Sequence, residues 1–269
     1  MRGNGPRLSV TLLTVFPVGG QGTAPDPGTA GAAMAWAPGV GLLLGVIAAV
    51  VLLAADHPLG LGPLTAAVLA VAALALLTRG LHLDGLADLA DGLGSGRPAG
   101  AALDIMRRSD IGPLGTVTVV LTLLIQVAAL SQAESAGDGR GPAALIAAVI
   151  TGRLAVTWAC RRGVPAARPD GLGALVAGTV RTAIPAALTL GTLAAAAAVV
   201  TISAEVLGKP LGWTLPLAVA AGLAAAYGLE RHAVRRLGGI TGDVLGALAE
   251  VATTVALVVA ASGPAGLSW

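Results

Sequence analysis

Seven long apolar stretches follow one another along this chain, and most of them contain no charged residue. Each is close to the ~20 residues that an α-helix needs to cross a hydrocarbon core of ~30 Å. Only 11% of the residues are charged, against roughly 25% in soluble domains, and no block alternates with the period of two of a membrane barrel strand. We therefore expect an all-α, polytopic integral membrane protein with a single domain over 1–269. The expected spans lie near 36–55, 60–78, 113–133, 142–160, 183–203, 211–229 and 244–262.

The basic residues alternate between the two sides of these spans. The segment before the first span and those after the second, fourth and sixth contain 2, 4, 4 and 3 Lys or Arg residues, and the other four segments contain 0, 1, 1 and 0. This positive-inside pattern predicts a multi-pass protein of the cytoplasmic membrane, with its N-terminus in the cytoplasm and its C-terminus outside. A functional site built from the loops and helix ends on the basic side would face the cytoplasm. Because stacking aromatics are missing around the arginines, we expect no nucleic acid partner.

The sequence before the first span contains no full-length apolar stretch. We interpret 7–18 as an interfacial or re-entrant segment and 19–31, which is rich in Gly, Pro and Thr, as a mobile loop. The single cysteine, Cys160, cannot form an intramolecular disulfide and says nothing about the redox compartment.

An acidic cluster stands out in the loop after the second span, in the stretch HLDGLADLADG at 82–92. Asp84, Asp88 and Asp91 are spaced i, i+4, i+7, which places them on one face of a helix, where their like charges repel. Oxygen ligands of this kind suit Mg²⁺. The alternative is that Asp84 caps a helix and the others form a solvated face beside the membrane. His82, as a lone histidine, is more often structural than catalytic.

Other charged residues extend the pattern. Arg107 and Arg108 follow the aspartates at the distance of a short helix, and arginines beside a metal-binding carboxylate face are typical of sites that handle a pyrophosphate. Arg153 and Glu250 lie inside expected spans, where an ionisable residue is a functional candidate; they either serve the site or form an ion pair with each other.

The stretch GGITGDVLGALAE, 238–250, opens the seventh span. Thr241 and Asp243 would lie at a helix N-terminus, where backbone N–H groups favour anions, and Asp243 is also a candidate N-cap. The loop RRGVPAARPDGLG at 161–173, taken alone, is interpreted as an ordinary basic cytoplasmic loop.

The stretch at 82–115, HLDGLADLADGLGSGRPAGAALDIMRRSDIGPLG, resembles the signature region of the cobalamin synthase family, also called adenosylcobinamide-GDP ribazoletransferase. LLTVFPV at 12–18, ARPDGLG at 167–173 and GGITGDVLGALAE at 238–250 resemble further segments of that family, in the family's order. Leu89 stands where the family often has Thr. Around Ser109 the family often has an acid before and a base after, and Arg108 and Asp110 reverse this, which leaves their individual roles open.

The resemblance implies that adenosylcobinamide-GDP is joined to α-ribazole or its 5′-phosphate, with release of GMP and Mg²⁺ as cofactor. On this interpretation the three aspartates at 84, 88 and 91 bind Mg²⁺. Arg107, Arg108 and Arg153 bind phosphate oxygens. Asp243 is a further metal ligand or the base, His82 is a second catalytic candidate, and Ser109, Thr241 and Glu250 give support. The lipid bilayer is an expected partner, and a homo-oligomer is left open.

Two other classes compete with this interpretation. A membrane phosphotransferase of the CDP-alcohol type also uses spaced aspartates, but its pattern requires Ala-Arg after the second Asp-Gly, and here Leu93 and Gly94 follow. A secondary transporter could use Arg153 and Glu250 to line a path, but the sequence shows no paired broken helices of an inverted repeat.

Overall fold

The computed structural model describes residues 4–18, 25–207 and 213–262, and these contain twelve α-helices and two isolated β-bridges. The first four helices are α1 (Gly5–Leu13), α2 (Pro27–Ala35), α3 (Ala37–Asp56) and α4 (Pro63–Leu77). The next four are α5 (Leu81–Gly94), α6 (Ala99–Ile105), α7 (Pro113–Ser135) and α8 (Arg140–Ala159). The last four are α9 (Gly171–Val176), α10 (Ala183–Leu207), α11 (Thr214–Leu237) and α12 (Gly242–Ala261).

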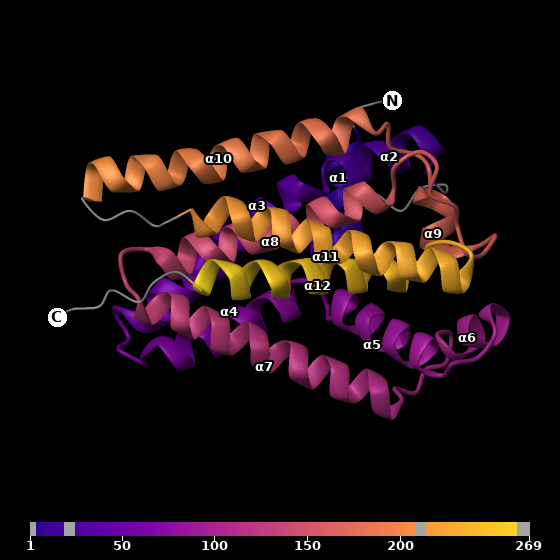
Figure 1. Cartoon of the computed structure of the whole chain (residues 1–269), viewed down its shortest axis with the longest axis horizontal. Helices are drawn as coiled ribbons and strands as arrows, with labels where there is room; N and C mark the ends of the chain where they lie inside the picture. Colours follow the sequence, from indigo (N-terminus) through magenta and orange to yellow (C-terminus); the bar gives the residue numbers. More distant parts are fainter. Residues whose placement is uncertain (1–3, 19–24, 208–212, 263–269) are drawn as a thin grey trace.

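The long helices run along one axis of the molecule, and α10 lies at the edge of the bundle in Figure 1. Helix α12 is central, because it packs against α5, α7, α8 and α11. Its inward face is built of small and aliphatic residues such as Ala247, Leu248 and Ala252, all at most 1% exposed. Large apolar side chains such as Leu124 and Leu190 are exposed on α7 and α10, as expected for surfaces that contact lipid.

Small residues allow the tightest helix contact. A Cβ on Gly41 of α3 would lie 2.9 Å from the carbonyl oxygen of Val149 in α8, and one on Gly45 would lie 3.0 Å from the Cα of Ile146. This is the close backbone approach that a small-xxx-small pair permits in membranes, where packing and hydrogen bonds drive helix association.

The all-α, polytopic character expected from the sequence is confirmed, and five expected spans match helices long and apolar enough to cross a membrane: α3, α7, α8, α10 and α12. The second expected span, 60–78, is not one straight helix of span length. Helix α4 has 15 residues, and α5 continues it after a bend of 86°. At the bend, Arg79 (φ 56°) and Gly80 (φ 66°) adopt the left-handed conformation, which ends α4.

The sixth expected span, 211–229, begins outside the described residues and continues in α11. This helix is not among the five candidates, because its last third contains Glu230, Arg231, Arg235 and Arg236. By length and composition, the described residues thus contain five candidate spans, or six if the bent pair of α4 and α5 counts as one, against the seven expected.

The N-terminal region is more ordered than expected. Positions 19–24 of the expected loop lie outside the described residues, but 27–31 are helical and belong to α2. Asp26 caps this helix by accepting hydrogen bonds from the N–H groups of Gly28 (2.9 Å) and Thr29 (3.0 Å). Helices α1 and α2 pack on each other and on α3.

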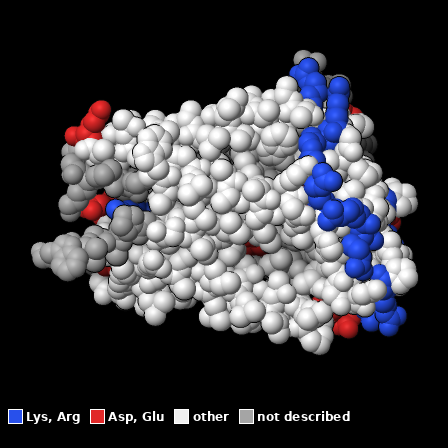
Figure 2. All heavy atoms as spheres, in the orientation of Figure 1, with Lys and Arg blue, Asp and Glu red and all other residues white. Residues whose placement is uncertain are grey.

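Charge is concentrated at one end of the bundle. Figure 2 shows Lys and Arg as a band across the end at which α6 and α9 lie in Figure 1, while the middle of the visible surface is almost free of charge. Arg235 and Arg236 at the end of α11 contribute to this end, and Arg236 donates to the carbonyl oxygen of Arg97 (3.3 Å). The basic segments identified in the sequence thus gather on one side of the apolar bundle.

Candidate active site

Helices α5 and α12 touch through their backbones at two glycines. A Cβ on Gly85 would lie 2.8 Å from the carbonyl oxygen of Asp243, and one on Gly246 would lie 3.1 Å from the Cα of His82. Any side chain at either position would separate the helices. The acidic stretch and the start of α12 are therefore held directly against each other.

The loop before α9 is joined to the same place. The amide of Ala167 donates to the carbonyl oxygen of Ile240 (3.0 Å), and the amide of Ile240 donates to that of Pro165 (2.9 Å). A Cβ on Gly173 would lie 2.6 Å from the same Ile240 oxygen. The loop 161–173, interpreted above as an ordinary basic loop, is thus a fixed wall beside the N-terminus of α12.

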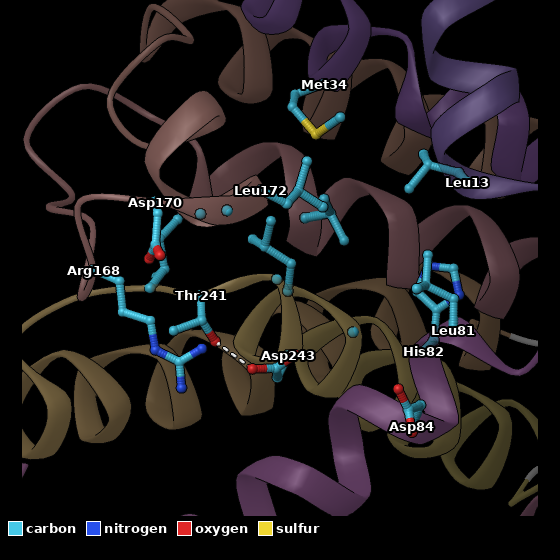
Figure 3. A pocket seen from close by; sticks show the side chains of 17 residues that line it. Leu13, Met34, Leu81, His82, Asp84, Arg168, Asp170, Leu172, Thr241 and Asp243 are labelled. Atoms are coloured by element: carbon cyan, nitrogen blue, oxygen red, sulfur yellow. Dashed lines mark hydrogen bonds between the residues drawn. The ribbon is translucent and has the colours of Figure 1, made fainter. Parts of the chain in front are cut away.

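These elements enclose a cavity of about 290 Å³. Figure 3 shows Met34 and Leu13 on one side, Asp84 and Asp243 on another, and Arg168 beside Thr241. The lining residues are Leu13, Met34, Leu81, His82, Asp84, Val156, Arg168, Asp170, Gly171, Leu172, Gly173, Ile240, Thr241, Gly242, Asp243, Leu245 and Gly246. Four segments far apart in the sequence, near 13, 82–84, 168–173 and 240–246, contribute to one cavity, and each overlaps a stretch that resembles the family.

The carboxylates at this cavity influence one another. Asp84 is exposed and Asp88 is half-buried in α5, which is not one of the five spanning helices. Burial, and then the charges of Asp84, Asp243 and Asp91, raise the pKa of Asp88 to about 7, while Arg168 opposes the rise. The carboxylates are therefore close enough for a cation among them to relieve their repulsion.

Asp243 is oriented by its neighbour. Thr241 is the N-cap of α12: its Oγ1 accepts from the amide of Val244 (3.2 Å) and donates to Oδ2 of Asp243 (3.1 Å), the dashed line in Figure 3. The helix cap is thus Thr241 and not Asp243. The Thr241 hydroxyl donates to one carboxylate oxygen of Asp243, and the other oxygen receives no hydrogen bond from Thr241.

Asp91 has a different set of contacts. Its two oxygens accept from the amides of Gly112 (2.7 Å) and Gly115 (2.9 Å), at the N-terminus of α7. A Cβ at either glycine would collide with this carboxylate. Asp91 therefore binds the first turn of a long spanning helix, where a negative charge is favourable.

The arginines expected from the sequence do not line the cavity. Nη2 of Arg107 donates to both oxygens of Asp170 (2.8 and 3.0 Å) in an exposed pair. Arg108 and Ser109 are exposed on the loop before α7. Arg153 is 3% exposed within α8.

Arg153 instead faces a separate small space among α4, α7, α8 and α12 that Glu250, Gln126 and Thr253 also line. Gln126 donates to Oε2 of Glu250 (2.8 Å) and to Thr254 (2.9 Å). In the described part of the chain, Nε of Arg153 has no hydrogen-bond partner. No hydrogen bond joins Arg153 to Glu250 among these residues.

The sequence analysis missed Arg168, which lines the cavity. Its charge acts on Asp88 and Asp243, and it also donates to the carbonyl oxygen of Leu103 in α6. The signal was present, since Arg168 belongs to ARPDGLG, one of the family-like stretches. Leu172, also missed, belongs to the same stretch, whereas Met34 had no comparable signal.

Among the described residues, three metal-type ligand atoms within 4.8 Å of one another occur only in Asp56, His57 and Glu134, at the end opposite to the arginine band. The aspartates of α5 and Asp243 are near one another but do not form such a convergent set.

A helical membrane bundle with carboxylates and an arginine around a cavity at its basic end is the arrangement of a membrane-embedded transferase that acts on phosphate groups. The chain belongs to the cobalamin-5-phosphate synthase family, whose model matches residues 5–261. Among curated relatives, the adenosylcobinamide-GDP ribazoletransferase of Frankia casuarinae is 46% identical over 262 residues, covering 95% of this chain and 93% of the relative. The enzyme of the same name from Bradyrhizobium diazoefficiens is 40% identical (95% and 92% covered), and that from a Nocardioides species is 38% identical (94% and 96%).

No solved structure gives a significant match. The family matches confirm the family and the enzyme that the motifs predict, an adenosylcobinamide-GDP ribazoletransferase of cobalamin biosynthesis. They set aside the CDP-alcohol and transporter interpretations.

Proposed function

We propose that the cavity between α1, α2, α5, α8 and α12 is the place where this chain joins adenosylcobinamide-GDP to α-ribazole or its 5′-phosphate. A ribose hydroxyl oxygen attacks the cobinamide-side phosphorus, the bond from that phosphorus to the bridging oxygen breaks, and GMP leaves with that oxygen. The observation that carries the proposal is the convergence of four family-like segments on one cavity, with carboxylates and an arginine in its walls.

Magnesium fits the residues that are present. Asp84, Asp88 and Asp243 offer hard oxygen donors. Burial first, and then the charges of the neighbouring carboxylates, raise the pKa of Asp88, and a divalent cation would offset those charges. Asp84 and Asp88 would hold Mg²⁺, with Asp243 beside it, and the bound ion would neutralise the charge of a pyrophosphate.

The remaining roles belong to the chain's own side chains. Arg168 binds phosphate oxygens, the role that the sequence assigned to Arg107, Arg108 and Arg153. The free oxygen of Asp243 accepts the proton of the attacking hydroxyl, while Thr241 fixes its orientation.

Other expected site residues support these groups from a distance. Asp91 holds α5 against the start of α7, and the bond from Arg107 places Asp170 at the rim. His82 is buried in the cavity wall, where its backbone meets Gly246, and Arg153 and Glu250 line the separate small space inside the bundle.

The membrane orientation is part of the same proposal. Seven crossings result if α11 and the bent pair are added to the five spanning helices, with the crossing of the bent pair ending near the start of α5. The arginine band then faces the cytoplasm, where the nucleotide substrate is found. In a Cys160→Ala background, a cysteine at Arg97 should be protected from an impermeant thiol reagent in intact cells, and one at Asp138 should react. Labelling at 97 from outside would place the site in the wrong compartment.

The activity is tested by GMP release from purified protein with adenosylcobinamide-GDP and α-ribazole 5′-phosphate, with and without Mg²⁺. Asp84→Asn and Asp243→Asn keep the side-chain shape and should lower turnover by orders of magnitude. Asp104→Asn, on the exposed side of α6, is the matched control and should leave it unchanged. Wild-type turnover in Asp84→Asn and Asp243→Asn would overturn the assignment of this cavity.

A further inference from the structure

The cavity has one wall without any polar side chain. Figure 3 shows Leu13 and Met34 on the side of the cavity away from Asp84, Asp243 and Arg168, and further apolar lining residues are Val156, Leu172 and Leu245. A ligand that fits this shape has an apolar part and a part with phosphate or hydroxyl groups. Resting on the proposed function, we infer that this wall binds the aromatic base of the riboside substrate, and that Met34 determines which base fits.

The size of the cavity decides between the two substrates. At about 290 Å³ it lies at the lower limit of small-molecule pockets, which span roughly 300–1,000 Å³. A corrinoid that carries a nucleotide exceeds that whole range, so it can place only its pyrophosphate at the mouth. A riboside is small enough to enter, with its base against the apolar wall and its ribose toward Asp243.

The apolar wall is held in place by several contacts, so its shape is fixed. The carbonyl oxygen of Met34 accepts from Thr157 of α8 (2.8 Å). A Cβ on Gly31 would lie 2.9 Å from the carbonyl oxygen of Thr179, and one on Gly5 would lie 2.8 Å from the Cβ of Ala32. Helices α1 and α2 are thus fixed to each other and to the bundle. The backbone that carries Met34 therefore cannot shift away from the cavity together with its helix.

The chemistry of the wall predicts a preference. A benzimidazole base presents only ring carbons and methyl groups there, whereas an adenine base would bury its exocyclic amine against side chains that offer no acceptor better than the weak thioether sulfur of Met34. An unpaired buried donor is costly, and discrimination of this kind is commonly 10-fold or more. We expect kcat/KM to be about 10- to 100-fold higher for α-ribazole 5′-phosphate than for the corresponding adenine α-riboside phosphate.

Two substitutions at one position test the inference. Met34→Ala enlarges the wall and should raise the KM for α-ribazole 5′-phosphate about 10-fold, with the KM for adenosylcobinamide-GDP unchanged. Met34→Gln supplies an acceptor of nearly the same length and should shift the selectivity ratio toward adenine by about 10-fold.

The matched control is Met106→Ala. Met106 is also buried, at 3% exposed against 0% for Met34, but it packs over Gly92 and does not line the cavity. It should lower thermal stability like Met34→Ala while leaving the selectivity ratio at the wild-type value.

Different results would overturn the inference about Met34 and the proposed function of the cavity. If the wild-type enzyme releases GMP but both Met34 variants keep the wild-type riboside KM and selectivity ratio, the base does not contact Met34 and the inference is wrong. If no riboside supports GMP release, the proposed function itself fails.

Discussion

The contact between α5 and α12 gives the sharpest test of how the site is built, through the single substitution Gly85→Ala. The added Cβ would lie 2.8 Å from the carbonyl oxygen of Asp243 and 2.9 Å from its Cα. Both atoms are backbone in the first turn of α12, so neither can rotate away. Ordinary contact begins at 3.4 Å, and the difference means that the helices must separate by about 0.6 Å.

The expected effects on stability and on turnover differ in size. Overpacking of this kind costs roughly 1–3 kcal/mol, and replacing a helical glycine by alanine returns about 1 kcal/mol, so the net destabilisation should be about 0–2 kcal/mol. The separation moves Asp84 and Asp88 away from Asp243. Since a misplacement of ~1 Å can cost ~100-fold in rate, we expect turnover to fall about 10- to 100-fold.

The assay is GMP release at saturating substrates, with thermal unfolding in detergent measured on the same preparations. Gly228→Ala in α11 is the matched control, because a Cβ there would meet no described atom within 4 Å. It should unfold at the same or a slightly higher temperature with unchanged turnover. Wild-type turnover in Gly85→Ala would refute the view that this backbone contact aligns the carboxylates.

Three further substitutions separate the roles of individual side chains. Asp91→Asn should lower the unfolding temperature, by the equivalent of about 1–3 kcal/mol, because an amide cannot accept from both Gly112 and Gly115; unchanged melting would contradict this role. Arg168→Lys keeps the charge but loses the planar fork, so kcat/KM should fall about 10- to 100-fold with nearly unchanged melting, and full activity would exclude phosphate binding by this residue. The raised pKa of Asp88, about 7, means that its ionised form opposes folding, so its stabilising contribution is complete below pH ~4 and is lost as the pH rises through 7. In EDTA, Asp88→Asn should therefore melt above the wild type at pH 8, and the gap should close toward pH 5; a gap independent of pH would argue against this titration.

The positions of the apolar runs located five of the seven expected spans, because a single helix needs a run of that length to cross a bilayer. They could not predict the break between α4 and α5, since the bend depends on Arg79 adopting a left-handed conformation in a sequence without proline at that point. Helix α2 was taken for a loop because of its Gly, Pro and Thr content, although Asp26 followed by Pro27 is a helix-start signal.

The acidic helix was predictable from its spacing, but the division of labour within it was not. The partners of Asp91 lie 21 and 24 residues away, at Gly112 and Gly115, and no local pattern identifies them. Because local sequence does not identify distant contacts, an arginine inside a span looked more important for the site than an arginine in a loop. The fold buries Arg153 away from the cavity and brings Arg168 to it through the backbone contacts with Ile240.

The central helix of the bundle is also the last one described in the chain, and this has a consequence for how the protein is made. Until α12 emerges from the ribosome and inserts, α5, α7, α8 and α11 lack one of the helices on which each of them packs. Arg153 and Gln126 then face the bilayer without Glu250 and Thr254, at a cost of several kcal/mol for a charged side chain at that depth. The close contact between α3 and α8 can form earlier, but α5, α7, α8 and α11 reach their final packing only when α12 is in place. A nascent chain that stops before 238 should be a substrate for membrane proteases, while a chain that includes α12 should resist them.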